Sequence, residues 1–266
     1  MELTVDGRSV YAYTGGKPFD AARPCIVFIH GALHDHSVWN LLARWFANHG
    51  HAVLAIDQPG HGRSAGPPLP SVEALADGVL ALLDAAGVRQ AALVGHSMGA
   101  LIALEAAARA PDRVTRLVLL GAAVPMKVSA ALLATAADEP LRAIDQVNAF
   151  SHSSLAAKPG YPGPGNWLHG ANRALMRKVQ AGRADVNLFA HDFALCDQYA
   201  NGLDAAAKVR CPAQLVVGRF DQMVPPASSR ALAAALKATT VELPCGHALM
   251  QEAPDATLQA LRDALA

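Results

Sequence analysis

The sequence of 266 residues has few of the features that mark secreted, membrane-spanning or zinc-binding chains. Its cysteines are scattered, with no Cys-x-x-Cys pair and no zinc-like spacing. No basic segment followed by an apolar one stands at the N-terminus, and no apolar run approaches the ~18 residues that a membrane-spanning helix needs. We therefore expect a cytoplasmic protein whose four cysteines are free thiols: Cys25, Cys196, Cys211 and Cys245.

An excess of charge of either sign is also lacking, since 22 Lys and Arg residues balance 22 Asp and Glu residues. Without a basic run or stripe, neither nucleic acid nor an anionic membrane surface is expected as a partner. The composition, 52% hydrophobic and 17% charged, excludes a disordered chain and provides a sizeable core. The length suits one large α/β unit that carries an insertion.

The sequence does contain a succession of short apolar strands separated by helical patterns. Strands of this kind, without polar alternation, predict a mostly parallel sheet covered by helices on both faces. The chain opens differently, with a hairpin pattern at Asp6-Gly7. The later predicted strands are Cys25–His30, Ala52–Ile56, Ala91–Val94, Val114–Gly121, Ala213–Val217 and Thr240–Leu243. The predicted helices between them are Val38–Asn48, Val72–Ala86, Met98–Ala110 and Ser228–Leu236, and a last helix begins near Pro254.

Residues 122–207 interrupt this alternation. Helical patterns at Ser129–Ala137, Leu141–Phe150 and Arg173–Ala181 surround a Pro/Gly-rich stretch at 158–165. We interpret 122–207 as a mostly helical cap inserted between two strands, and residues 1–121 with 208–266 as one core domain.

The segment Gly-His-Ser-Met-Gly at 95–99 places Ser97 between a predicted strand and a predicted helix. A serine at such a turn is forced out of the sheet, and small neighbours allow the strained backbone that this requires. The positive end of the helix then stabilises negative charge that develops beside the serine. Ser97 is therefore the predicted nucleophile, and we expect the neighbouring His96 to point away from it.

A serine hydroxyl is a weak nucleophile without a base, and a neutral imidazole needs a carboxylate to fix its tautomer. His247 directly follows the last predicted strand, and Asp221 follows the strand before it. The carboxyl ends of parallel strands lie at one edge of the sheet, so the two loops are expected to be neighbours. Other acidic residues remain candidates: Asp145, Asp192 and Asp197 in the insertion, and Glu252, which we assign to the start of the last helix.

An oxyanion that develops on the substrate needs hydrogen-bond donors. We expect one to be the backbone N–H of Met98, directly after the nucleophile. The other should come from the loop after the Cys25–His30 strand, with the N–H of Ala32 as the first choice and that of Leu33 as the second.

Taken together, these motifs resemble those of the α/β-hydrolase fold family. The matching segments are His-Gly-Ala at 30–32, Asp-Gln-Pro-Gly-His-Gly-Arg-Ser at 57–64, the segment around Ser97, the loop of Asp221, and Gly-His at 246–247. The resemblance covers nearly the whole chain except the insertion, which is similar to the variable cap of the family. It implies a Ser–His–Asp hydrolase, and a serine at 97 argues against the branches that use a carboxylate nucleophile. By analogy with the family, Asp57 and Arg63 are expected to brace their loop.

We therefore expect hydrolysis of a carboxylic ester or related acyl compound, with no cofactor and no metal. The triplet His34-Asp35-His36 has no third partner at metal-ligand spacing and is assigned to ordinary loop polarity. C–C bond hydrolase, lactonase, acyltransferase and cofactor-free haloperoxidase activities stay open, as does a non-catalytic ligand receptor. The substrate is expected to be small to medium in size and partly apolar. Candidate contacts are Leu33 and Trp167, with Phe150, Tyr161 and Phe189 as further aromatic residues of the insertion.

Overall fold

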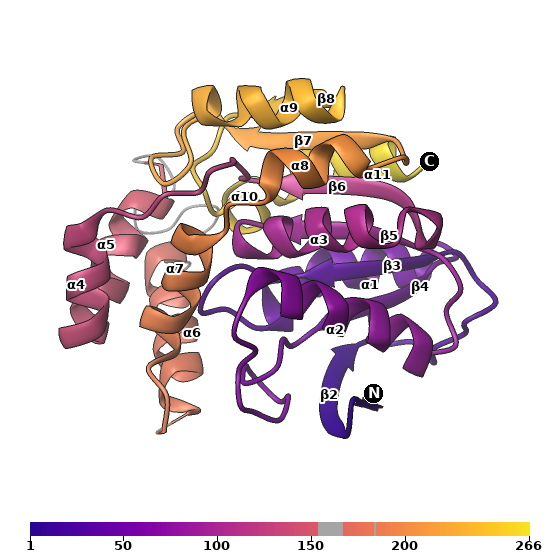
Figure 1. Ribbon diagram of the computed structural model, residues 1–266, viewed down its shortest axis with the longest axis horizontal. Coiled ribbons are helices and arrows are strands. Elements are labelled where there is room, and N and C mark those ends of the chain that lie inside the picture. Colours follow the sequence, from indigo (N-terminus) through magenta and orange to yellow (C-terminus); the bar gives the residue numbers. More distant parts are fainter. Residues whose placement is uncertain (154–166, 184) are drawn as a thin grey trace.

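The fold is built on one eight-stranded sheet, seen in a computed structural model that describes residues 1–153, 167–183 and 185–266 (Figure 1). The strand order is β1-β2-β4-β3-β5-β6-β7-β8. Strands β1 and β2 are antiparallel to their neighbours, and all later pairs are parallel. This confirms the predicted mostly parallel α/β architecture and its opening hairpin. The strands are β1 Glu2–Val5, β2 Arg8–Tyr13, β3 Cys25–Ile29, β4 Ala52–Ile56, β5 Ala91–His96, β6 Val114–Leu120, β7 Ala213–Gly218 and β8 Thr239–Leu243.

Helices cover both faces of the sheet, which explains why its central strands are almost entirely apolar. Every residue of β3, β4 and β5 is buried. One face packs against α2, α3, α8 and α9, and the other against α1, α10 and α11 (Figure 1). The bounds of these helices are α1 Asn40–Asn48, α2 Val72–Ala85, α3 Met98–Arg109, α8 Gly202–Lys208, α9 Arg230–Leu236, α10 Leu249–Glu252 and α11 Pro254–Leu265.

The first helix begins two residues later than the sequence predicts. Residues His36–Trp39 form a separate 3-10 turn, η1, before α1. Asp35 caps this turn, because its carboxylate accepts a hydrogen bond from the Ser37 N–H at 2.9 Å. In α2, by contrast, Ser71 caps the helix as predicted and accepts from the Ala74 N–H at 3.1 Å.

Most of the segment between β6 and β7 forms a group of helices beyond the carboxyl ends of the strands (Figure 1). Their apolar faces share a cluster of their own, separate from the two sheet cores, which also takes in Leu33. These helices are α4 Ala130–Asp138, α5 Pro140–Ser151, α6 Leu168–Ala181 and α7 Leu188–Gln198. We call α4–α7 the cap. The helix α8 packs against α3 in the core layer, and the domain limits at 122 and 207 stay a prediction. The Pro/Gly-rich stretch at 158–165 lies outside the described residues.

Candidate active site

Ser97 occupies a sharp turn between β5 and α3 with a backbone φ of +54°. That left-handed conformation is unfavourable for a residue with a Cβ, so its surroundings must enforce it. A Cβ on Gly95 would overlap the backbone of Gly99, and one on Gly99 would overlap the carbonyl groups of Ile29 and His30. Both glycines are therefore needed for the close packing of α3 on the strands, as the motif predicts.

His247 and Asp221 are joined by a short hydrogen bond. Nδ1 of His247 lies 2.7 Å from Oδ2 of Asp221, and both side chains are buried. The other oxygen of Asp221 accepts from the N–H groups of Met223 and Val224, each at 2.8 Å. The carboxylate therefore fixes the imidazole with the proton on Nδ1, leaving Nε2 free to accept a proton.

The rival carboxylates have other partners. Asp145 forms ion pairs with Arg173 and Arg177 on the cap surface. Asp197 accepts from the Val128 N–H at 3.1 Å, and Asp192 lies 2.8 Å from Nε2 of His61. Asp221 is thus the carboxylate that the structure places on His247.

The loop of His247 is held by groups that the sequence does not reveal. The N–H groups of His247 and Ala248 donate to the Ser151 carbonyl, at the end of α5, at 2.7 and 3.0 Å. Glu252, predicted to begin the last helix, instead lies in α10 and accepts from the N–H groups of Gly246 at 3.0 Å and Ser153 at 2.9 Å. The chain leaving α5 is therefore bonded directly to the loop of the predicted base.

Ser97 and His247 line one cavity of about 460 Å³. Gly31, Ala32, His34 and His96 line it beside these two residues, and the rest of its lining is mostly apolar. The apolar wall residues are Met126, Val128, Ala131, Leu132, Val147, Phe150, Met176, Phe193, Met223 and Val224. Such a site suits an acyl group that is attacked at its polar end and held by apolar contacts along the rest.

The loop after β3 lies against Ser97. A Cβ on Gly31 would come 3.2 Å from the Cβ of Ser97, and Ala32 lines the cavity. Met98 is the first residue of α3, so its N–H has no acceptor within the helix. The second-choice donor is excluded, because the N–H of Leu33 donates to Oδ2 of Asp192 at 2.7 Å.

The two predicted substrate contacts do not line the cavity. Leu33 is fully buried in the apolar cluster of the cap, so it packs rather than binds. Trp167 is 53% exposed at the start of α6, with its ring against Gly170. Phe150 does line the cavity, whereas Phe189 is buried in the cap cluster and Tyr161 lies outside the described residues.

His96, which the sequence predicts to point away from Ser97, has its ring beside His247. It lines the cavity, its ring centroid lies 4.8 Å from that of His247, and its Nε2–H donates to the His247 carbonyl at 2.9 Å. Burial, followed by the nearby His247, holds the pKa of His96 well below its usual value. His96 is thus a neutral support for the loop of His247, and its position next to Ser97 was the only signal in the sequence.

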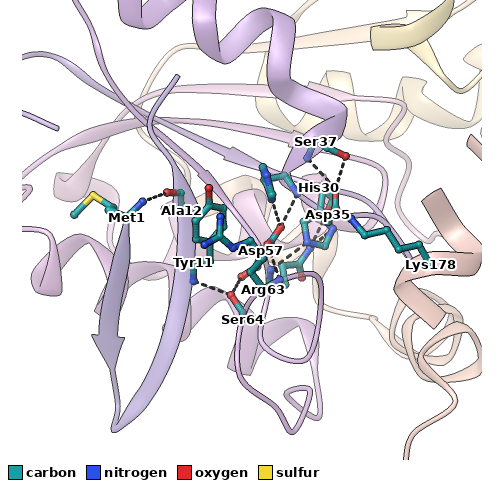
Figure 2. A network of polar contacts seen from close by, with 12 residues as sticks. Met1, Tyr11, Ala12, His30, Asp35, Ser37, Asp57, Arg63, Ser64 and Lys178 are labelled. Atoms are coloured by element: carbon teal, nitrogen blue, oxygen red, sulfur yellow. Dashed lines mark hydrogen bonds and ion pairs between the residues drawn. The ribbon is translucent and has the colours of Figure 1, made fainter. Parts of the chain in front are cut away.

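The segment at 57–64 braces the core, as expected (Figure 2). Oδ1 of Asp57 accepts from the backbone N–H of His36 at 2.6 Å, and Oδ2 accepts from the Arg63 N–H at 2.8 Å. The Ser64 hydroxyl donates to the Asp57 carbonyl at 2.6 Å and accepts from the Tyr11 N–H at 2.9 Å. This network ties the loop after β4 to β2 and to the η1 turn.

The potential ligands Asp35, His36 and Asp57 have atoms within 4.8 Å of one another. However, Asp57 accepts N–H groups through both oxygens, and Asp35 accepts from Ser37. His34 points elsewhere, since it lines the cavity and its Nε2 lies 2.8 Å from Oδ1 of Asn172. The three residues of the triplet therefore have different roles: His34 lines the cavity, Asp35 caps the 3-10 turn, and His36 contacts Asp57.

Comparison with known proteins identifies the family to which this chain belongs. The sequence pattern of the alpha/beta hydrolase family matches residues 26–260, and the chain belongs to that family. It is 31% identical over 208 residues to the putative carbamate hydrolase RutD of Klebsiella pneumoniae (strain 342), covering 74% of each chain. It is 39% identical over 102 residues to the mouse sn-1-specific diacylglycerol lipase ABHD11, a match that covers 38% of this chain and only 33% of the mouse protein.

Among solved structures, the enol-lactonase from Burkholderia xenovorans LB400 is 26% identical, with a TM-score of 0.83 and coverage of 100% of this chain and 99% of that one. A membrane phospholipase A is 27% identical with a TM-score of 0.78 and coverage of 100% and 84%. Within the described residues, no helix has the length and apolar character needed to cross a membrane. The chain is thus a member of a hydrolase family whose relatives act on varied substrates.

Proposed function

We propose that the protein is a serine hydrolase that cleaves a carboxylic ester or related acyl compound through an acyl-enzyme. The observation that carries the proposal is the 2.7 Å contact between His247 and Asp221 beside a cavity that Ser97 also lines. In the first step, Nε2 of His247 takes the hydroxyl proton as Ser97 attacks the carbonyl carbon. The Ala32 and Met98 N–H groups stabilise the oxyanion, and the leaving alcohol receives the proton from His247.

The second half of the cycle removes the acyl group. His247 accepts a proton from water, the resulting hydroxide adds to the ester carbonyl of the acyl-enzyme, and Ser97 leaves as the protonated hydroxyl. Asp221 stabilises the imidazolium that forms in both halves without becoming protonated itself. No metal or organic cofactor takes part in these steps.

The cavity favours a partly apolar acyl group of small to medium size. Its walls supply apolar side chains from α4, α5, α6 and α7, and His96 and His247 line it together with Ser97. A lactone is the second candidate substrate, because an enol-lactonase is similar over the whole chain, and a lactone is an ester whose leaving alcohol stays attached. Either substrate uses the same attack by Ser97.

Turnover of a panel of p-nitrophenyl esters with different acyl lengths, together with lactones and 2-hydroxy-6-oxo-dienoates, tests the proposal. The protein should hydrolyse at least one ester or lactone, and Ser97→Ala should abolish that activity. Unchanged turnover in Ser97→Ala would contradict the role of the serine. Turnover of the dienoates alone would assign C–C bond hydrolysis instead.

A further inference from the structure

The buried carboxylate of Asp192, on α7 of the cap, meets two loops of the core. Its Oδ2 accepts from the backbone N–H of Leu33, after β3, at 2.7 Å, and it lies 2.8 Å from Nε2 of His61, after β4. All three residues are at most 2% exposed. The contacts span 159 and 131 positions of the sequence, and Asp192 itself does not line the cavity.

The hydrogen bonds of His61 require both of its ring nitrogens to carry protons. Nε2 faces the Asp192 carboxylate, and Nδ1 lies 3.3 Å from the Pro59 carbonyl oxygen. Only an imidazolium donates at both nitrogens. Burial opposes this charge, but the attraction and hydrogen bond of Asp192 outweigh it and raise the pKa of His61. Burial likewise opposes ionisation of Asp192, and His61 and the Leu33 N–H overcome it and lower the pKa of Asp192.

The loop that receives this carboxylate is strained. Leu33 has a φ of +53°, in the left-handed region that a leucine adopts only when its surroundings impose it. Two features of the cap impose it: the hydrogen bond from the Leu33 N–H to Asp192, and the burial of the Leu33 side chain in the cap cluster. Leu33 directly follows Ala32, the proposed oxyanion donor.

We propose that Asp192 is a positioning residue, which fixes the loop of Ala32 and so makes the oxyanion site depend on the docked cap. This inference rests on the proposed function. The inference also assigns a role to His61, which takes no part in the proposed catalytic steps. His61 holds the Asp192 carboxylate in place and keeps it ionised. A loop whose donor is displaced by a fraction of an ångström stabilises the oxyanion less well but leaves substrate binding unchanged.

The kinetic test compares variants of one helix. In Asp192→Ala, kcat for a short p-nitrophenyl ester should fall about tenfold to a hundredfold with KM within about threefold, because a donor to the oxyanion is misplaced. Asp192→Asn keeps an oxygen that can accept from the Leu33 N–H, so it should recover most of the lost kcat. The matched control is His191→Ala, which removes the neighbouring contact of α7 with the core, from His191 Nε2 to the Leu69 carbonyl at 3.0 Å, and should leave kcat within about twofold.

A second readout does not depend on activity. Amide hydrogen exchange should be faster at Ala32 and Leu33 in Asp192→Ala than in the wild type, and unchanged there in His191→Ala. If Asp192→Ala fails to fold, Asp192→Leu fills similar space without an acceptor and takes its place. Wild-type protein with no ester turnover and no labelling at Ser97 would refute the proposed function, while amide exchange would still test the role of Asp192.

Two results would overturn the inference. One is an Asp192→Ala or Asp192→Leu protein with wild-type kcat and wild-type exchange at Ala32 and Leu33. The other is an equal loss of kcat in His191→Ala, which would show that any loosening of α7 has the same effect. The ionisation of the pair is checked by the NMR titration of His61, whose pKa should lie above its ordinary value; its other charged and titratable neighbours are His30 and Asp57, and His191 acts on Asp192.

Discussion

Nδ1 of His247 lies 2.7 Å from Oδ2 of Asp221, although 26 positions separate the two residues in the sequence. The contact forms because β7 and β8 are parallel neighbours whose carboxyl ends lie at the same edge of the sheet. Asp221 is further fixed by the N–H groups of Met223 and Val224. The backbone of the Asp221 loop therefore holds this carboxylate in position beside His247 before any substrate binds.

Replacing Asp221 by asparagine tests this alignment. Asp221→Asn should lower kcat by on the order of 10³–10⁴ with little change in KM, since the tautomer of His247 is no longer fixed and its imidazolium is no longer stabilised. The measurement is steady-state hydrolysis of a p-nitrophenyl ester. The control is Asp145→Asn, at a half-exposed carboxylate of the cap, which should retain full activity. A loss below about tenfold in Asp221→Asn would assign the role to another carboxylate.

Gly121 provides a test of how closely His247 is packed. A Cβ at this position would lie 2.9 Å from Cε1 and 3.0 Å from Nδ1 of His247, and Gly121 has a φ of +57°. Gly121→Ala should therefore displace the imidazole and reduce kcat by about tenfold or more.

The matched control separates this displacement from backbone strain. Gly87 has a similar φ of +67°, but a Cβ there would meet nothing within 4 Å. Gly87→Ala should lower stability by about 1 kcal/mol while leaving kcat unchanged. Equal kcat values in Gly121→Ala and the wild type, measured alongside thermal unfolding of both variants, would contradict the placement of His247.

Histidine ionisation predicts how stability changes in mild acid. His30 is fully buried, its Nδ1 lies 2.8 Å from the Gly31 carbonyl, and its Nε2 accepts from the Gln58 N–H at 3.1 Å. Burial, followed by the charge of His61, lowers the pKa of His30 to about 4. Between this value and the ordinary histidine pKa near 6.5, the unfolded state binds more protons than the folded state, so the contribution of His30 to stability falls as the pH falls.

Urea unfolding at pH 7.5 and pH 5 measures this effect. The free energy of unfolding of wild-type protein should fall on acidification more steeply than that of His30→Gln, by up to about 1.4 kcal/mol per pH unit. His61 contributes in the opposite direction. Because its pKa is raised, it stabilises the fold fully at pH values below the ordinary histidine pKa, and this contribution is lost as the pH rises through the raised pKa. Both proteins contain His61, so the difference between them removes its contribution. Identical pH dependence in both would show that His30 is not held neutral by the fold.

Phe150 should contribute to the preference for acyl length. It lines the cavity yet is 50% exposed, so its removal should cost little stability. In Phe150→Ala, kcat/KM for an octanoate ester should fall about fivefold to tenfold, as expected for a lost apolar contact of about 1 kcal/mol, while acetate hydrolysis stays within about twofold. Leu141→Ala, on the same helix but away from the cavity, is the control. Equal losses for both esters would place Phe150 outside the path of the acyl chain.

The core and the Ser97, Asp221 and His247 positions were predictable because they depend on local patterns. Apolar strands separated by helices define a parallel sheet, and its strand order brings three loops to one edge. The role of the glycines around Ser97 could also be predicted from the sequence, since only small residues fit a strand-to-helix turn of this kind.

The contacts between the cap and the core were not predictable, because they join residues far apart in the chain through single hydrogen bonds. Nothing in the sequence around Asp192 indicates that it meets Leu33 and His61, and Glu252 gives no sign that it bridges Gly246 and Ser153. The sequence also did not predict the helix α7. Apolar residues lie on all of its sides, so the 3.6-residue periodicity that marks an amphipathic helix is weak. The orientation of His96 was not predictable either, because it depends on a hydrogen bond to the carbonyl of His247, 151 positions away in the sequence.

The most direct measurement of the role of Ser97 is covalent labelling with a fluorophosphonate probe, followed by mass spectrometry of the intact and digested protein. One probe molecule per chain should attach, at Ser97, with no adduct in Ser97→Ala and a much slower reaction in His247→Ala. Absence of labelling at Ser97 in folded wild-type protein, or equal labelling in Ser97→Ala, would contradict a nucleophilic serine at this turn.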